Sequence, residues 1–118
     1  MIPAIRRLCE LFMGKCRDTQ TMQRIVDICS AVEQRRESNR YWEAKQLFDD
    51  IRQKYRKGAG ETEYWQYLFE EKCTKSLFNM THPPGAFDAD SAFYIVPFAL
   101  VFGRKLGIPD EKILEIVI

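Results

Sequence analysis

Hydrophobic residues recur every three to four positions along most of this chain, and stretches that alternate hydrophobic and polar residues are nearly absent. That period is typical of α-helices with one buried face. Candidate caps, glycines and prolines divide the pattern into helices over about 3–16, 19–36, 39–57, 61–79 and 91–106, with a short last helix after Pro109. The sequence therefore predicts an all-α fold of five to six helices packed around a central apolar helix at about 91–106.

The segment expected to form this central helix is the most hydrophobic part of the chain. Ala92, Ala99 and Gly103 form a strip of small residues along it, which lets a neighbouring helix approach closely. Pro97 leaves two interpretations open: the helix bends there, or the run 93–96 is extended and the helix begins later. The hydrophobic run has about 12 residues, whereas crossing a bilayer takes about 20, so no membrane span is expected.

The helix expected over 61–79 is apolar on two sides. One stripe contains Trp65, Phe69 and Leu77, and a second contains Tyr64 and Tyr67. One packing face needs a single stripe, so this helix either lies between neighbours or offers its second side to a partner.

Length and composition fit one folded domain over 1–118. The 118 residues are 46% hydrophobic and 30% charged, which is too apolar for a disordered chain. Eighteen Lys and Arg against seventeen Asp and Glu give a net charge of +1, which excludes a whole-molecule field that attracts nucleic acid or anionic membranes. Arg6 and Arg7 precede any apolar run, so the amino terminus does not match a secretory signal peptide and we expect a cytoplasmic protein.

The sequence contains no pattern typical of an active site or a metal site. Its four cysteines form no C-x-x-C pair and lie on predicted apolar stripes, so we expect free thiols in the core. His82 is the only histidine, and it lies in residues 81–90, which we expect to form the longest loop. No potential nucleophile occurs at a sequence spacing from His82 that is typical of a catalytic pair. Asp88 and Asp90 are explained more simply as helix caps than as calcium ligands. We therefore expect no enzyme activity, no catalytic residue, no metal and no cofactor.

Charge is divided unevenly along the chain. Residues 1–57 hold 13 Lys and Arg and 8 Asp and Glu, whereas residues 58–118 hold 5 and 9. Acidic residues interrupt the basic runs of the first half, which match no nucleic-acid motif and are better explained as a solvated face. In the second half acidic residues accompany aromatic ones, which suits a basic protein partner. The candidate partner-binding residues there are Glu61, Glu63, Tyr64, Tyr67, Glu71, Phe87, Asp88 and Asp90.

Trp42 departs from the pattern of its helix. Helical spacing puts it on the polar side, opposite Leu47 and Ile51. Exposed tryptophans are enriched among interface hot spots, so Trp42 is an outlying candidate anchor. It can also fold back beneath a neighbouring loop, and the high average burial of tryptophan favours this second interpretation.

An acidic turn, an apolar helix with a central proline and a Leu-Gly-Ile ending follow one another in residues 87–108, FDADSAFYIVPFALVFGRKLGI. This segment resembles small helical immunity proteins of bacterial contact-dependent growth inhibition and related polymorphic toxin systems. The resemblance implies a non-catalytic cytoplasmic protein that binds one cognate toxin domain, often a nuclease, and occludes its active site or partner-binding surface. Its charge departs from that pattern, because inhibitors of nucleases are commonly strongly acidic and this chain is balanced.

The leading hypothesis is therefore a monomeric immunity protein that forms a 1:1 complex with its toxin. The main alternative is a nucleic-acid-binding helical module that uses the basic first half, and a third is an enzyme of unrecognised type. The salt dependence of binding distinguishes the first two hypotheses, because affinity for phosphate groups falls steeply as the salt concentration rises, whereas the affinity of a mixed apolar interface does not.

Overall fold

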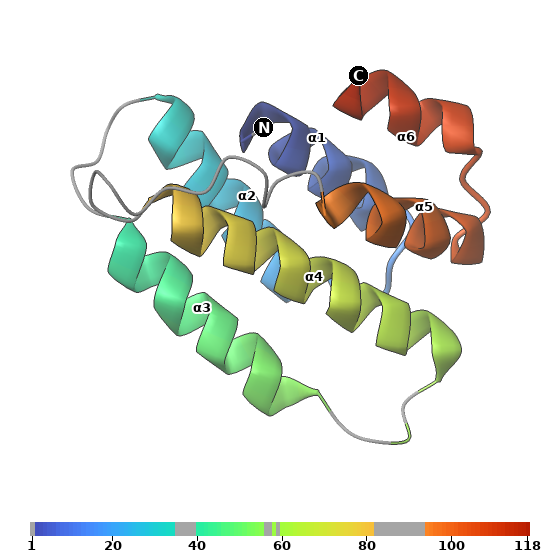
Figure 1. Ribbon diagram of the computed structural model, residues 1–118. Helices are drawn as coiled ribbons and strands as arrows, with labels where there is room; N and C mark the ends of the chain where they lie inside the picture. Colours follow the sequence, from blue (N-terminus) through green and yellow to red (C-terminus); the bar gives the residue numbers. More distant parts are fainter. Residues whose placement is uncertain (1, 35–39, 56–57, 59, 82–93) are drawn as a thin grey trace.

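The computed structural model describes residues 2–34, 40–55, 58, 60–81 and 94–118, and the regular structure in these ranges is all helical (Figure 1). The six helices are α1 (Ile2–Met13), α2 (Gln20–Glu33), α3 (Tyr41–Lys54), α4 (Glu61–Met80), α5 (Ile95–Lys105) and α6 (Asp110–Val117). The predicted all-α single domain is confirmed. Asp88 and Asp90, expected to cap the helix that became α5, lie outside the described residues.

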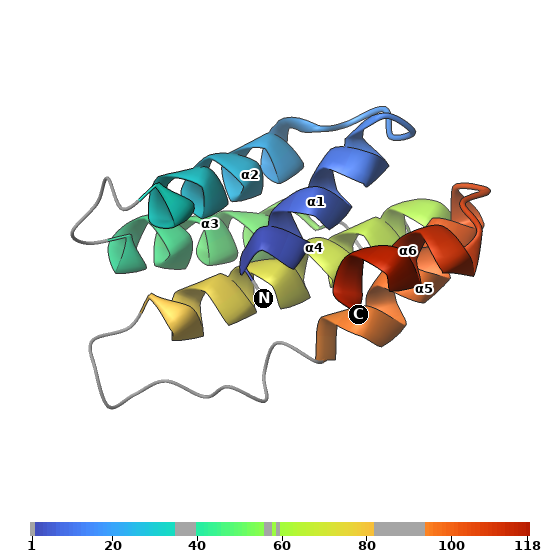
Figure 2. The ribbon, with the colours of Figure 1, turned by 90° about the horizontal axis from the view of Figure 1, so that it is seen from above.

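The arrangement of the helices differs from the expectation in one respect, because the most apolar helix is not the middle one. Figure 1 shows α4 between α3 and α5, and α4 also packs against α2. α1 lies along α2, and α6 packs against α1 and α5, as the second view shows (Figure 2). This position between neighbours covers much of both apolar sides of α4, although Tyr64 remains 39% exposed.

Three fully buried phenylalanine rings join α1, α4 and α5. Phe12 meets Phe69 edge to face with 4.9 Å between ring centroids, and it meets Phe102 in the same way at 5.0 Å. The rings of Phe69 and Phe102 stack at 5.9 Å. Such aromatic pairs add to the free energy gained by burying the rings, so this cluster is the centre of the core.

α5 begins at Ile95, so Pro97 lies in its first turn. Backbone N–H groups there have no acceptor within the helix, and the proline costs nothing at that place. The helix thus begins later than 91 and Pro97 does not stand in its interior, but Ile95 and Val96 are helical and not extended as the second interpretation expected. Further along α5, a Cβ at Gly103 would collide with the Cδ1 atom of Ile113, so the small residue lets α6 approach.

The junction between α5 and α6 is set by Gly107. Gly107 has a φ of +76°, which glycine adopts without steric cost. The N–H of Ile108 donates to the carbonyl of Gly103 at 2.8 Å, and the N–H of Gly107 donates to the carbonyl of Arg104 at 3.1 Å. These two bonds form a Schellman motif, which satisfies carbonyls at the end of α5 and turns the chain towards α6.

Cys9, Cys29 and Cys73 are buried in the core and Cys16 is half-buried, which confirms the expected packing role. Burial raises the pKa of Cys16 to about 11 and raises the pKa of Cys29 and Cys73 further. All four are free thiols in the structure, and the thiolate is the reactive form.

Iodoacetamide at about pH 8 is therefore expected to alkylate folded protein slowly and first at Cys16. The buried Cys9, Cys29 and Cys73 should react only as fast as the protein opens, because the reagent cannot reach them in the core. Mass spectrometry of peptides over time measures each rate, and denatured protein, in which all four react alike, is the control. Equal rates for Cys16 and Cys73 in folded protein would show that α4 is not packed as described.

No helix among the described residues is long and apolar enough to span a membrane.

Candidate functional site

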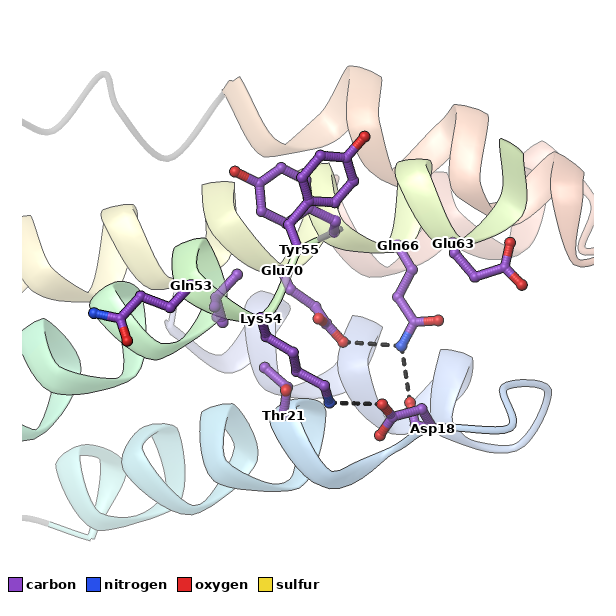
Figure 3. A pocket seen from close by; sticks show the side chains of 10 residues that line it. Asp18, Thr21, Gln53, Lys54, Tyr55, Glu63, Gln66 and Glu70 are labelled. Carbon is purple, nitrogen blue, oxygen red and sulfur yellow. Dashed lines mark hydrogen bonds and ion pairs between the residues drawn. The ribbon is translucent and has the colours of Figure 1, made fainter. Parts of the chain in front are cut away.

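A cavity of about 490 Å³ opens where the end of α3, the first half of α4 and the start of α2 meet (Figure 3). Most of the side chains around it are polar or aromatic, although the protein's core is aliphatic and aromatic. The residues that line the cavity are Asp18, Thr21, Ile51, Gln53, Lys54, Tyr55, Glu63, Gln66, Tyr67 and Glu70. A cleft of this size with a few convergent polar groups is typical of a binding site.

Asp18 ties the three elements together at one side of the cavity. Its Oδ1 atom accepts a hydrogen bond from the N–H of Gln20, the first residue of α2, at 3.3 Å. Its Oδ2 atom pairs with Lys54 Nζ at 2.6 Å, and its carbonyl accepts from Gln66 Nε2 at 2.8 Å. Figure 3 shows Lys54 and Gln66 reaching Asp18 from different helices. The hydrogen bond from Lys54 lowers the pKa of Asp18, so this carboxylate stays ionised.

Glu70 is a buried carboxyl group in the same cavity. Its residue is only 7% exposed, and its Oε2 atom accepts a hydrogen bond from Gln66 Nε2 at 3.0 Å. No other hydrogen bond or ion pair to its carboxylate exists among the described residues. Burial raises the pKa of Glu70 to about 7, although the bond from Gln66 and the charge of Lys54 oppose the shift. A carboxylate poised to titrate inside a cavity is a candidate functional group.

Tyrosines form an aromatic wall of the cavity. The rings of Tyr55 and Tyr67 stack with 4.3 Å between centroids, and Tyr64 lies 5.9 Å from Tyr55. Tyr55 and Tyr67 are half-buried, whereas Tyr64 is 39% exposed. The Tyr67 hydroxyl donates to Glu71 Oε2 at 2.6 Å, which fixes the ring, and burial is the main reason that the pKa of Tyr67 rises to about 12.

The structure brings together only some of the residues predicted to bind a partner. Glu63 and Tyr67 line the cavity, and Tyr64 stands beside it. Glu71 is held by Tyr67, and Glu61 pairs with Lys105 at 2.5 Å, so both carboxylates already have partners. The remaining three candidates, Phe87, Asp88 and Asp90, lie outside the described residues, as does His82.

Trp42 lies in the first turn of α3, away from the cavity at the other end of that helix. It is 66% exposed, and its ring meets that of Tyr41 edge to face at 5.0 Å. The favoured interpretation, in which Trp42 packs beneath a loop, is therefore wrong. The helical spacing alone indicated its exposure correctly.

Sequence reasoning did not select Asp18, Lys54, Gln66 or Glu70 as site residues. Asp18 and Lys54 belong to no recognisable motif, and Glu70 is one of several acidic residues in the second half of the chain. One signal for Glu70 exists, because a helix places it on the same side as Cys73 and Leu77, which are buried. A charged residue on a buried stripe indicates either a paired charge or a site.

The side chains of the cavity offer several groups that can bind a ligand. No group of three or more His, Cys, Asp or Glu side chains that could hold a metal ion occurs among the described residues. Carboxylate oxygens and tyrosine faces instead suit a ligand that carries positive charge and donates hydrogen bonds.

Comparisons with models of protein families, with curated proteins and with solved structures found no match to this chain.

Proposed function

We propose that this protein binds a protein partner with a basic surface, and that the partner is a cognate bacterial toxin domain whose activity the complex blocks. The observation that carries the proposal is the acidic tyrosine surface, which we define as Glu63, Tyr64, Tyr67, Tyr55 and Glu70 around the cavity. Tyrosines are enriched in protein interfaces, and complementary charge selects the partner. The toxin as partner rests on the resemblance of residues 87–108 to immunity proteins.

The balance of charge at this surface supports a basic partner. Lys54 is the only basic residue in the cavity lining, and it is neutralised by Asp18. Glu63 and Glu70 have no ion pair among the described residues. A negative charge therefore remains beside the tyrosines whenever Glu63 is ionised, and it increases when Glu70 ionises.

Ion pairing weakens the case for nucleic-acid binding by the first half of the chain. Nine of its Lys and Arg residues are described, and five of them form ion pairs with carboxylates. Those five are Arg6, Arg24, Arg40, Lys45 and Lys54. Phosphate binding releases counterions from DNA in proportion to the cations that are available, and a paired cation contributes little.

The experiment is co-expression in a bacterial host with the toxin domain encoded immediately upstream of this gene. We expect this protein to restore growth and to elute with the toxin as a 1:1 complex. Tyr64→Ala should weaken binding at least thirtyfold, or about 2 kcal/mol, if Tyr64 is a hot spot. Glu63→Arg should mainly slow association, because a charge at the rim steers the encounter.

Glu115→Arg on α6 is the matched control, since Glu115 is exposed and does not line the cavity. The melting temperature of each variant shows whether it is folded. Unchanged affinity in folded Tyr64→Ala and Glu63→Arg would place the binding surface elsewhere. The proposed function would be refuted if this protein did not restore growth, or if no toxin were encoded upstream. Binding to DNA with an affinity that falls steeply as the salt concentration rises would favour the nucleic-acid alternative.

A further inference from the structure

The cavity beside Glu70 holds more acceptor capacity than the protein uses. The carboxylate of Glu70 has one hydrogen bond, to Oε2, so its Oε1 atom has no partner among the described residues. The residue is only 7% exposed, but its Oε1 atom is not among the fully buried unpaired atoms and therefore meets the solvent of the cavity that it lines. Folding leaves this mostly buried carboxyl group with one protein donor and with one oxygen open to the cavity, and such a group favours a ligand that supplies further donors.

We propose that the cavity receives the guanidinium group of one arginine side chain of the partner, which donates to Glu70 while it lies against the tyrosine wall. This inference rests on the proposed function, since it names the anchor by which a basic partner engages the acidic tyrosine surface. The carboxylate, the aromatic face and the volume are three independent properties of the same cavity that fit this one group.

Guanidinium fits better than other cations for a geometric reason. It is planar, its N–H groups form a fork that matches a carboxylate, and it stacks on aromatic rings. Glu70 offers the carboxylate at the inner end, and the stacked rings of Tyr55 and Tyr67 offer a flat face. A lysine ammonium is more strongly hydrated and has no flat surface to stack, so it gains less from this wall.

An anion is disfavoured by the charges around the cavity. The charged and titratable groups that face Glu70 are Asp18 before α2, Lys54 and Tyr55 at the end of α3, Glu63 and Tyr67 on α4, and the thiols of Cys16 and Cys73. Lys54 is the only cation among them, and it already pairs with Asp18. A bound arginine would thus meet carboxylates and rings, whereas a phosphate or carboxylate ligand would meet repulsion.

The probe for the test is arginine amide acetylated at its α-nitrogen, which carries the guanidinium as its only charge. Titration into isotope-labelled protein, followed by NMR, should shift the amide signals of residues around the cavity. A single side chain is expected to bind with a dissociation constant of about 1–10 mM. The equivalent citrulline amide, which has the same shape and no charge, should bind at least tenfold more weakly.

Affinity for the arginine probe should rise between about pH 6 and 8, because burial raises the pKa of Glu70 to about 7 and its carboxylate forms in that range.

Glu70→Gln keeps the side-chain volume and removes the charge, so it should bind the arginine probe at least tenfold more weakly and with no dependence on pH. Glu115→Gln, the same change on the outer side of α6, should bind like the parent protein. Three results would each overturn the inference. They are equal affinity for the arginine and citrulline probes, NMR signal shifts confined to residues away from the cavity, and unchanged affinity of Glu70→Gln for the arginine probe. The probe needs no toxin, so loss of this anchor and loss of the proposed function are seen separately: toxin binding without probe binding would refute only the anchor.

Discussion

Replacing Glu70 by Gln is expected to stabilise the protein by about 3 kcal/mol at pH 8 and by almost nothing at pH 4. The ordinary pKa of this group is 4.5, and burial raises it to about 7 in the folded state. Each unit of pKa difference between the folded and unfolded states corresponds to about 1.4 kcal/mol. Urea unfolding followed by circular dichroism at a series of pH values gives the free energy of unfolding of both proteins.

The direction of this effect follows from proton binding. Between about pH 4.5 and 7 the folded state holds the Glu70 proton more tightly than the unfolded chain does, so stability falls as the pH rises. Below this range both states are protonated, and Gln resembles the neutral acid. Other carboxylates titrate in both proteins, and Asp18, Asp50 and Asp110, whose pKa values are lowered, act in the opposite direction. The difference between the two proteins removes those contributions.

Glu115→Gln serves as the control for the general effect of removing an exposed carboxylate. It should leave the free energy of unfolding within about 0.5 kcal/mol of the parent at each pH. A difference between Glu70→Gln and the parent that stays constant from pH 4 to pH 8 would show that Glu70 is solvated. A confirmed difference has a functional meaning, because a residue that lowers stability at neutral pH is typical of a binding site.

The helices and the core could be predicted from the sequence because the signal for them is local. Spacing of apolar residues identifies the buried stripe of each helix, and it correctly placed Phe69, Cys73 and Leu77 on one side of α4. Helix ends were less accurate. α1 was expected to continue to about residue 16 but ends at Met13, because Gly14 follows and the N–H groups of Lys15 and Cys16 both turn back to the carbonyl of Phe12.

The candidate site could not be predicted because its parts are distant in the sequence. Lys54 bonds to a carboxylate 36 residues away, and Gln66 bonds to a carbonyl 48 residues away. Periodicity shows which face of a helix is buried but not which other helix covers it, so no local pattern joins Asp18 to Gln66. The prediction that α5 would be central failed for the same reason, since hydrophobicity alone does not determine the order of packing.

Charge counted along the sequence also failed to distinguish exposed carboxylates from engaged ones. Glu61 and Glu63 are two residues apart and equally acidic, yet Glu61 pairs with Lys105 whereas Glu63 lines the cavity. Only the packing of α5 against α4 brings Lys105 to Glu61. Of these two carboxylates, only that of Glu63 is left without an ion pair among the described residues.

Phe12→Ala is expected to lower the free energy of unfolding by about 3–5 kcal/mol, which is a large part of the stability of a domain of this size. Phe12 is fully buried, and its ring meets Phe69 on α4 and Phe102 on α5. Truncation to Ala leaves a cavity between three helices, which cannot close it without moving apart. Urea unfolding measures the loss as a lower midpoint with an unchanged slope.

Trp42→Ala supplies the matched control, because it truncates a larger aromatic residue that is 66% exposed. It should cost less than about 1 kcal/mol, since little buried surface and only one ring contact are lost. A cost as large as that of Phe12→Ala would mean that Trp42 is buried in solution. The expected small cost would make Trp42→Ala a folded protein in which any loss of toxin affinity reports a missing contact. Normal toxin affinity in that variant would exclude Trp42 as an anchor and leave the acidic tyrosine surface as the candidate interface.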